Sequence, residues 1–217
     1  MKDSIQIIRD KTHEDVSNTL FSIISTEISK SNNYNLGLSG GSTPLYLYKK
    51  IAEKFKENKS ITVWTVDERH VELKNEYSNQ GMINSIFQDT AIKLLSYKYY
   101  ENPQKSAEYY SKLVLENIQT FNSAILGVGG DGHIASLFPF SNALNSTRKG
   151  FVETEVNILS KWRITSTFKL LLEIENIYIL ATGEGKKEIL SKIGKDFDLP
   201  INKLLGMREK TIILTDQ

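Results

Sequence analysis

A glycine-rich segment that carries an acid and a histidine has the clearest chemical potential in this 217-residue chain. Residues 126–139 read LGVGGDGHIASLFP, and the apolar run 124–126 leads directly into the glycines. This pattern predicts a buried strand that ends in a tight turn, where backbone approaches a ligand closely. Asp131 and His133 lie in that turn, two residues apart. Such a histidine can take a proton from water and return it, and Asp131 can orient it or bind the ligand separately.

Other interpretations of this segment are weaker. Residues 127–132 match the glycine pattern of dinucleotide-binding proteins, but Pro139 follows too soon for the long helix that this pattern opens. A lone histidine is most often structural, and neither His13 nor His70 has metal-ligand spacing to His133. We therefore expect no nicotinamide cofactor and no metal. We interpret His13 as a solvated residue at a helix start, and His70 as a residue that could line the same site.

A second glycine segment has the composition of an anion site. Residues 39–44 read SGGSTP, in which Gly40 and Gly41 expose backbone N–H groups and Ser42 and Thr43 add hydroxyl donors. Pro44 suits the first turn of a following helix, whose N-terminus favours phosphate. The alternative is an ordinary strand-to-helix turn with a serine or threonine cap. The segment lacks the lysine and spacing of a nucleotide P-loop, so we do not expect an NTPase.

Charged residues follow other apolar runs. Asp67, Glu68 and Arg69 come after residues 63–66. Three charges at the end of a buried strand need partners or a ligand, and Arg69 can grip a phosphate or carboxylate or form a structural ion pair. Lys186 follows a glycine pair at a helix start, where a cation opposes the helix dipole unless an anion binds; simple surface charge is the alternative. Arg163 stands beside apolar residues and fits a structural role as well.

Short apolar runs and amphipathic segments alternate along the chain and must position these residues. Strands are predicted at residues 5–8, 34–38, 62–66, 124–128, 177–181 and 211–215, and helices at residues 14–29, 45–55, 79–87, 106–118, 168–174 and 186–192. The alternation predicts a three-layer, Rossmann-like α/β fold, with a mostly parallel sheet and helices on both faces. Because ligands bind beyond the carboxyl ends of such strands, four of the segments that follow strands should converge on one rim.

Composition limits the function classes further. The chain is 40% hydrophobic with a net charge of +1, which suits a single domain over residues 1–217 and gives no field toward nucleic acid or an anionic membrane. The absence of cysteine excludes disulfides, thiolate metal sites and cysteine nucleophiles. Residues 1–4 precede no apolar signal core and no run is long enough to span a membrane, so we expect a cytoplasmic protein. Monomer and homodimer both remain open.

Together these segments resemble the 6-phosphogluconolactonase family, which shares a fold with glucosamine-6-phosphate deaminases. The resemblance runs in order through residues 39–44, 67–69 with Val71, Ser78 and Asn79, then 127–139, 163–165 and 183–186. Residues 131–139 are its most specific part. The chain departs from the family's usual residues at Glu72, Asn122 and Lys161-Trp162, which look like loop variations.

The resemblance implies an enzyme that hydrolyses 6-phosphoglucono-1,5-lactone to 6-phosphogluconate in the oxidative pentose phosphate pathway, without a cofactor. His133 would be the general base and then the acid, Arg69 with backbone N–H groups would stabilise the oxyanion, and Asp67 or Asp131 would orient His133 or bind sugar hydroxyls. The residues implied to hold the substrate phosphate are Gly40, Gly41, Ser42, Thr43, Arg163 and Lys186.

Two alternatives stand beside the lactonase. Deaminases of this fold carry Phe-Asn-Glu-Pro after Asp-Gly-His-Ile-Ala, and their glutamate assists the histidine in opening the sugar ring. Phe138 occupies that position here and cannot relay a proton, which favours the lactonase. The other alternative is a non-catalytic sugar-phosphate sensor of the kind joined to a DNA-binding segment. Before the strand at 34–38, which leads into the glycine turn, only one strand and one helix are predicted, which is too little for such a segment.

Overall fold

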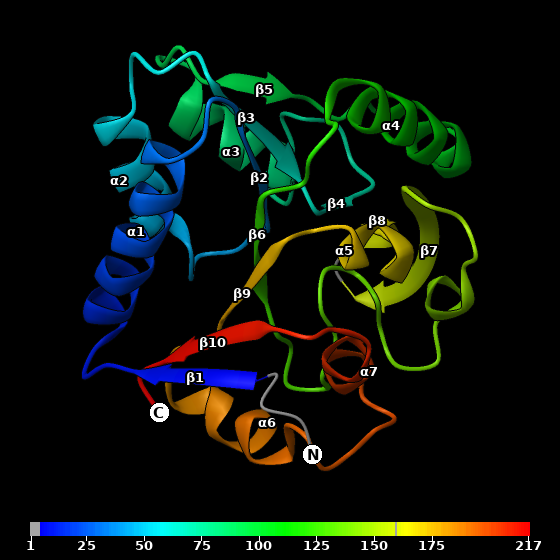
Figure 1. Ribbon diagram of the computed structural model, residues 1–217. Helices are drawn as coiled ribbons and strands as arrows, with labels where there is room; N and C mark the ends of the chain where they lie inside the picture. Colours follow the sequence, from blue (N-terminus) through cyan, green and yellow to red (C-terminus); the bar gives the residue numbers. More distant parts are fainter. Residues whose placement is uncertain (1–4, 159) are drawn as a thin grey trace.

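A seven-stranded sheet forms the centre of the protein in a computed structural model that describes residues 5–158 and 160–217 (Figure 1). Its strands, in order across the sheet, are β1 (Ile5–Arg9), β10 (Thr211–Thr215), β9 (Asn176–Leu180), β6 (Ser123–Gly127), β2 (Tyr34–Leu38), β3 (Ile61–Thr65) and β5 (Lys93–Leu95). Every neighbouring pair in this sheet is parallel. The expectation for residues 1–4 lies outside the described residues.

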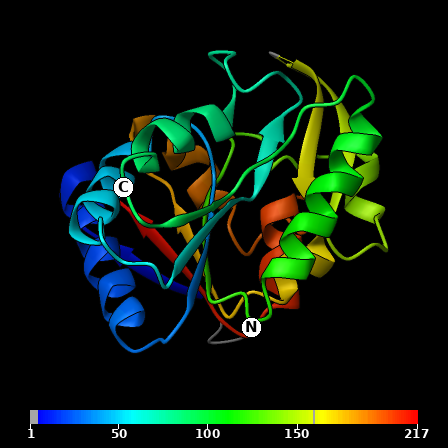
Figure 2. The same cartoon turned by 90° about the horizontal axis from the view of Figure 1, so that it is seen from above.

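Helices cover both faces of this sheet (Figures 1 and 2). On one face pack α1 (His13–Ser29), α2 (Leu45–Lys54) and α3 (Asn79–Phe87); on the other pack α4 (Pro103–Asn117), α5 (Phe168–Leu172), α6 (Lys187–Lys192) and α7 (Pro200–Met207). Alternate residues of β9 serve the two cores: Ile177 and Ile179 face α4–α7, whereas Tyr178 and Leu180 face α1–α3. The predicted three-layer α/β fold is confirmed.

A second sheet, which the sequence pattern does not predict, lies beside α4 (Figure 1). It is antiparallel and has the order β4 (Asp67–Arg69), β8 (Ser160–Ser166) and β7 (Phe151–Ile158). The pairing sets Arg69 opposite Arg163 and Asp67 opposite Thr165. Two segments that are about a hundred residues apart in the sequence therefore enter the site as neighbouring strands.

Several predicted boundaries differ from the structure. The helix predicted at 106–118 begins at Pro103, because the side chain of Asn102 accepts hydrogen bonds from the backbone N–H groups of Gln104 and Lys105. The helix predicted at 168–174 ends at Leu172, and the one predicted at 186–192 divides into a 3₁₀ turn, η2 (Glu184–Lys186), and α6. A second 3₁₀ turn, η1 (Asn142–Asn145), as well as β5 and α7, were not predicted.

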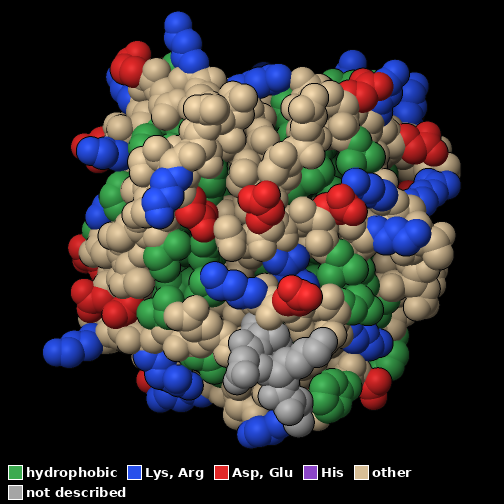
Figure 3. All heavy atoms as spheres, in the orientation of Figure 1, with side chains coloured by type: hydrophobic (Ala, Val, Ile, Leu, Met, Phe, Trp, Pro, Cys, Tyr) green, Lys and Arg blue, Asp and Glu red, His purple; other side chains and the backbone are tan. Residues whose placement is uncertain are grey.

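The distribution of charge on the surface agrees with the nearly equal numbers of basic and acidic residues (Figure 3). Figure 3 shows acidic and basic side chains interspersed over one face of the molecule. Within residues 5–158 and 160–217, no helix combines the length and the apolar character needed to cross a bilayer.

Candidate active site

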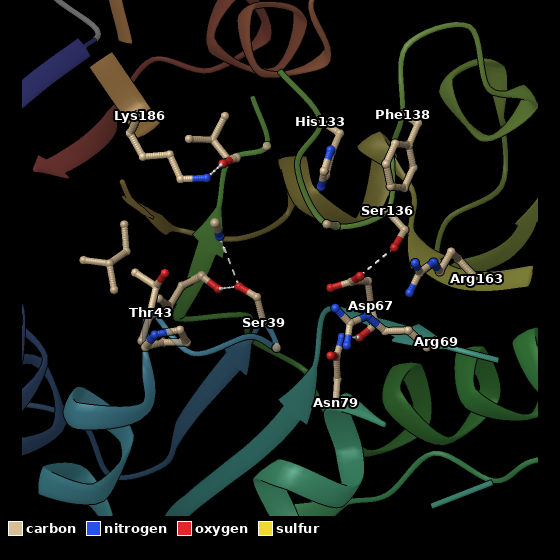
Figure 4. A pocket seen from close by; sticks show the side chains of 18 residues that line it. Ser39, Thr43, Asp67, Arg69, Asn79, His133, Ser136, Phe138, Arg163 and Lys186 are labelled. Carbon is tan, nitrogen blue, oxygen red and sulfur yellow. Dashed lines mark hydrogen bonds between the residues drawn. The ribbon is translucent and has the colours of Figure 1, made fainter. Parts of the chain in front are cut away.

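A pocket of about 310 Å³ opens where β2, β3, β6 and β9 reach their carboxyl ends (Figure 4). The predicted site residues that line it are Gly40, Thr43, Asp67, Arg69, His133, Arg163 and Lys186. Gly41 and Ser42 belong to the same turn as Gly40 but are exposed and are not among the lining residues. Asp131 reaches the pocket only through His133. The structure thus brings together segments from five parts of the chain.

The turn after β6 holds His133 from several directions. Its Nδ1 lies 2.6 Å from Asp131 Oδ1. Because an ionised carboxylate only accepts, Nδ1 is the donor in this bond, and in the neutral imidazole Nε2 is then the nitrogen with a free lone pair. The ring of Phe138 packs on the imidazole, with 4.2 Å between centroids and 30° between planes. A Cβ at residue 129 would lie 2.2 Å from the imidazole, so only glycine fits there. Asp131, and not Asp67, is the acid that contacts His133.

The same turn is closed by its own backbone and does not open a helix. Gly129 N–H donates to His133 O at 2.8 Å, and Gly132, with φ at 81°, donates to Gly129 O at 3.0 Å. Val128 forms a bridge with Ile134. This geometry explains why the dinucleotide-like glycine spacing does not signify a nucleotide-binding helix.

Asp67 is tied to the histidine turn through a serine. Asp67 is buried, and its Oδ2 accepts a hydrogen bond from Ser136 Oγ at 2.6 Å. The backbone N–H of Ser136 donates in turn to Thr165 Oγ1 at 3.0 Å. These contacts join β4, β8 and the turn after β6 beneath the pocket, so Asp67 presents a fixed acceptor to a ligand.

Two arginines face the pocket from paired strands. Arg69 and Arg163 are register partners on β4 and β8 and share a face of the small sheet. The Nη1 of Arg69 donates to Tyr77 O at 2.8 Å. Arg163 is almost fully buried, and burial followed by the nearby charge of Arg69 lowers the pKa of its guanidinium. Two positive charges on one side of the pocket suit an anionic ligand.

Lys186 reaches the pocket from a turn that is anchored at its base. Its Nζ donates to Val128 O at 2.8 Å (Figure 4). Gly183 has φ at 93°, and its N–H donates a hydrogen bond to Asp216 Oδ1 at 2.8 Å, which fixes the turn. His13 lies 2.8 Å from Thr182 Oγ1 and is half-buried, so the interpretation of His13 as a solvated residue is wrong.

The turn after β2 leaves the N-terminus of α2 without a side-chain cap. Pro44 occupies the cap position, in place of the first helical position, and among the described residues no side chain caps the first turn. Ser39 Oγ donates to Ile125 O at 2.5 Å and accepts from Gly127 N–H at 3.2 Å, which holds the two glycine turns side by side. Leu45 N–H donates to Ser42 O at 3.3 Å, and the N–H groups that follow it in the first turn are available to an anion.

Sequence reasoning gave no role in the chemistry to three polar lining residues, Ser39, Asn79 and Ser136. Their position immediately after a strand, at a helix start or beyond the histidine is the only sequence signal. His70 does not line the pocket: its Nε2 lies 2.8 Å from Tyr100 O and its ring packs on Tyr99.

The fold and pocket define a class of protein, a parallel α/β enzyme whose pocket holds an oriented histidine together with several cations. Such a pocket is suited to acid–base chemistry on an anionic small molecule. A family model described as glucosamine-6-phosphate isomerases/6-phosphogluconolactonase matches residues 9–213. The chain belongs to this family.

Individual relatives are similar over most of their length. A 6-phosphogluconolactonase of Thermotoga maritima is 34% identical over 182 residues, covering 81% of this chain and 80% of the relative. The crystal structure of a 6-phosphogluconolactonase from Thermotoga maritima superimposes with a TM-score of 0.83 at 26% identity, over 98% of both chains. A monomeric glucosamine-6-phosphate deaminase shares the fold, with a TM-score of 0.81 at 20% identity over 98% of this chain and 97% of the other.

Proposed function

We propose that this chain is a 6-phosphogluconolactonase, which hydrolyses 6-phosphoglucono-1,5-lactone to 6-phosphogluconate in the oxidative pentose phosphate pathway. The relatives named above support the activity. The observation that carries the choice within the family is the phenyl ring of Phe138 on the imidazole of His133. This ring fills the place from which a deaminase's glutamate would act, and it leaves His133 with Asp131 as its acidic partner.

In this proposal His133 moves the proton. Its Nε2 removes a proton from water as the water oxygen attacks the lactone carbonyl carbon, and Asp131 stabilises the imidazolium that forms. The carbonyl oxygen becomes an oxyanion, which Arg69 and nearby backbone N–H groups stabilise. The ester bond to the ring oxygen then breaks, and the imidazolium returns its proton to that oxygen. Asp67 accepts a hydrogen bond from a sugar hydroxyl.

Cations and backbone donors of the pocket hold the phosphate. Lys186 and Arg163 provide positive charge, and the turn from Gly40 to Thr43 provides hydrogen-bond donors at the start of α2. Gly41 and Ser42 contribute through the shape of that turn. Fixing the phosphate positions the remote lactone carbonyl near His133, which is a large source of rate enhancement. We place this chemistry in one domain and in the cytoplasm, where a phosphorylated sugar is retained by its charge.

The test is direct. Purified protein is given freshly generated lactone, and acid release is followed with a pH indicator against the spontaneous rate. We expect a clear acceleration that His133→Ala abolishes. Ammonia release from glucosamine 6-phosphate would instead support the deaminase. Tight binding of 6-phosphogluconate without turnover of the lactone would support a sensor and refute the proposal.

A further inference from the structure

The three charged residues of β4 point in two directions. Successive side chains of a strand face opposite sides, so Asp67 and Arg69 face the pocket while Glu68 faces away from it. Glu68 is only 1% exposed. An ionised carboxylate in such a position is costly unless hydrogen bonds compensate for the lost water. The proposed mechanism gives no role to Glu68, although both of its sequence neighbours, Asp67 and Arg69, have a role in it.

Four donors converge on the Glu68 carboxylate. Oε1 accepts from the N–H groups of Arg69 and Asn79, each at 2.7 Å. Oε2 accepts from Ser78 Oγ at 3.0 Å and from Gln80 N–H at 2.7 Å. Ser78 is the N-cap of α3, and Asn79 and Gln80 are its first two residues. The carboxylate therefore occupies the N-terminus of α3, where the helix dipole favours negative charge.

The same helix start also contacts both neighbours of Glu68. Asn79 Nδ2 donates to the backbone O of Asp67 at 2.8 Å. Arg69 Nη1 donates to the backbone O of Tyr77, the residue before the N-cap, at 2.8 Å. All three residues of β4 are thus bonded to the segment that begins α3. The carboxylate of Glu68 accepts three of these five bonds, and it accepts a fourth hydrogen bond from Arg69 N–H within β4.

We infer that Glu68 is a positioning residue that fixes Asp67 and Arg69 in the pocket by clamping β4 to the start of α3. Both carboxylate oxygens are needed, because each accepts two bonds. An amide in place of the carboxylate has the same size, yet its NH₂ group meets two donors whichever way it turns. The clamp then opens on one side and the guanidinium of Arg69 shifts from the developing oxyanion. The inference rests on the proposed function, because it concerns how that reaction is organised.

The experiment compares Glu68→Gln with Glu27→Gln. Glu27 is a matched control because its carboxylate also accepts four hydrogen bonds, here from the side chains of Tyr34, Ser123, Asn176 and Tyr178 near the amino ends of the strands. At a temperature where circular dichroism shows both variants folded, we expect E68Q to lower kcat by about 10- to 100-fold with KM changed less than about twofold. E27Q should keep both constants while it lowers the melting temperature.

Each outcome is informative. A folded E68Q with wild-type kcat, or an equal loss of kcat in E27Q, would overturn the positioning role. If E68Q does not fold, Ser78→Ala removes one donor to Oε2 and should lower kcat by about fivefold, the equivalent of one hydrogen bond; an unchanged kcat would overturn the inference. Wild-type protein without lactonase activity would refute the proposed function, whereas an active wild type beside an equally active E68Q would refute the clamp alone.

Discussion

The close approach of Gly129 to His133 makes a single methyl group a specific probe of the proposed base. In Gly129→Ala the new Cβ would lie 2.2 Å from both Cε1 and Nδ1 of the imidazole and 2.6 Å from Asp131 Oδ1. Ordinary contact begins near 3.4 Å, so the ring must retreat by about 1.2 Å or lose its bond to Asp131. A misplacement of about 1 Å costs about a hundredfold in rate, equivalent to about 2.7 kcal/mol of transition-state stabilisation.

The assay is hydrolysis of fresh lactone under saturating conditions, with kcat and KM determined separately. We expect kcat to fall by about a hundredfold and KM to change little, because the atoms nearest the new Cβ belong to His133 and Asp131. Gly130→Ala is the matched control: a Cβ there meets nothing within 4 Å, and the residue has no positive φ. A G129A enzyme with wild-type kcat, or a G130A enzyme with an equal loss, would refute the assignment of His133 as the base.

Three further predictions concern stability, binding and pH. Glu27→Gln should lower the free energy of unfolding by about 1–3 kcal/mol in denaturant titrations, because an amide nitrogen replaces an acceptor among four donors. Lys186→Met should raise KM for the lactone by about 10- to 100-fold, the loss of one charge-assisted bond to phosphate. Burial lowers the pKa of His70, so the folded protein binds fewer protons there than the unfolded chain. The stability of wild type relative to His70→Gln should therefore be greatest above about pH 6.5 and fall as the pH is lowered.

These predictions have clear contrary outcomes. An unchanged unfolding midpoint in E27Q would mean that its four contacts contribute no net stability. A wild-type KM in K186M would place the phosphate away from that lysine. Parallel pH profiles for wild type and H70Q would show that His70 titrates equally in the folded and unfolded states.

Local sequence signals were sufficient to predict the parallel sheet and the histidine turn. Apolar runs such as residues 34–38 and 211–215 coincide with strands, because burial on both faces demands apolar residues at consecutive positions. The glycines after β6 predicted the turn, in which Gly129 lies against His133 and Gly132 has a positive φ. Because β2 and β6 are neighbouring parallel strands, the turns that follow them lie at the same edge of the sheet, and the position of the pocket follows from this topology.

Long-range pairing was not accessible from local patterns. β4 consists of three charged residues, and its strand character comes from hydrogen bonds to β8, about a hundred residues away. His13 looked solvated because its partner, Thr182, lies 169 residues further along the chain. The hydrogen bonds of Glu68 depend on how the start of α3 packs on β4. The sequence of residues 67–69 alone does not predict that packing.

The alternation within β4 also constrains how this chain can vary in evolution. The insertion of one residue between Val66 and Asp67, or the deletion of Val66, would exchange the two faces of the strand. The pocket would then receive one lone carboxylate in place of an acid and a guanidinium, while a guanidinium would meet the amides of α3. Substitutions in the neighbouring loops do not alter this alternation, but a change of length here would remove the positive charge of Arg69 from the pocket.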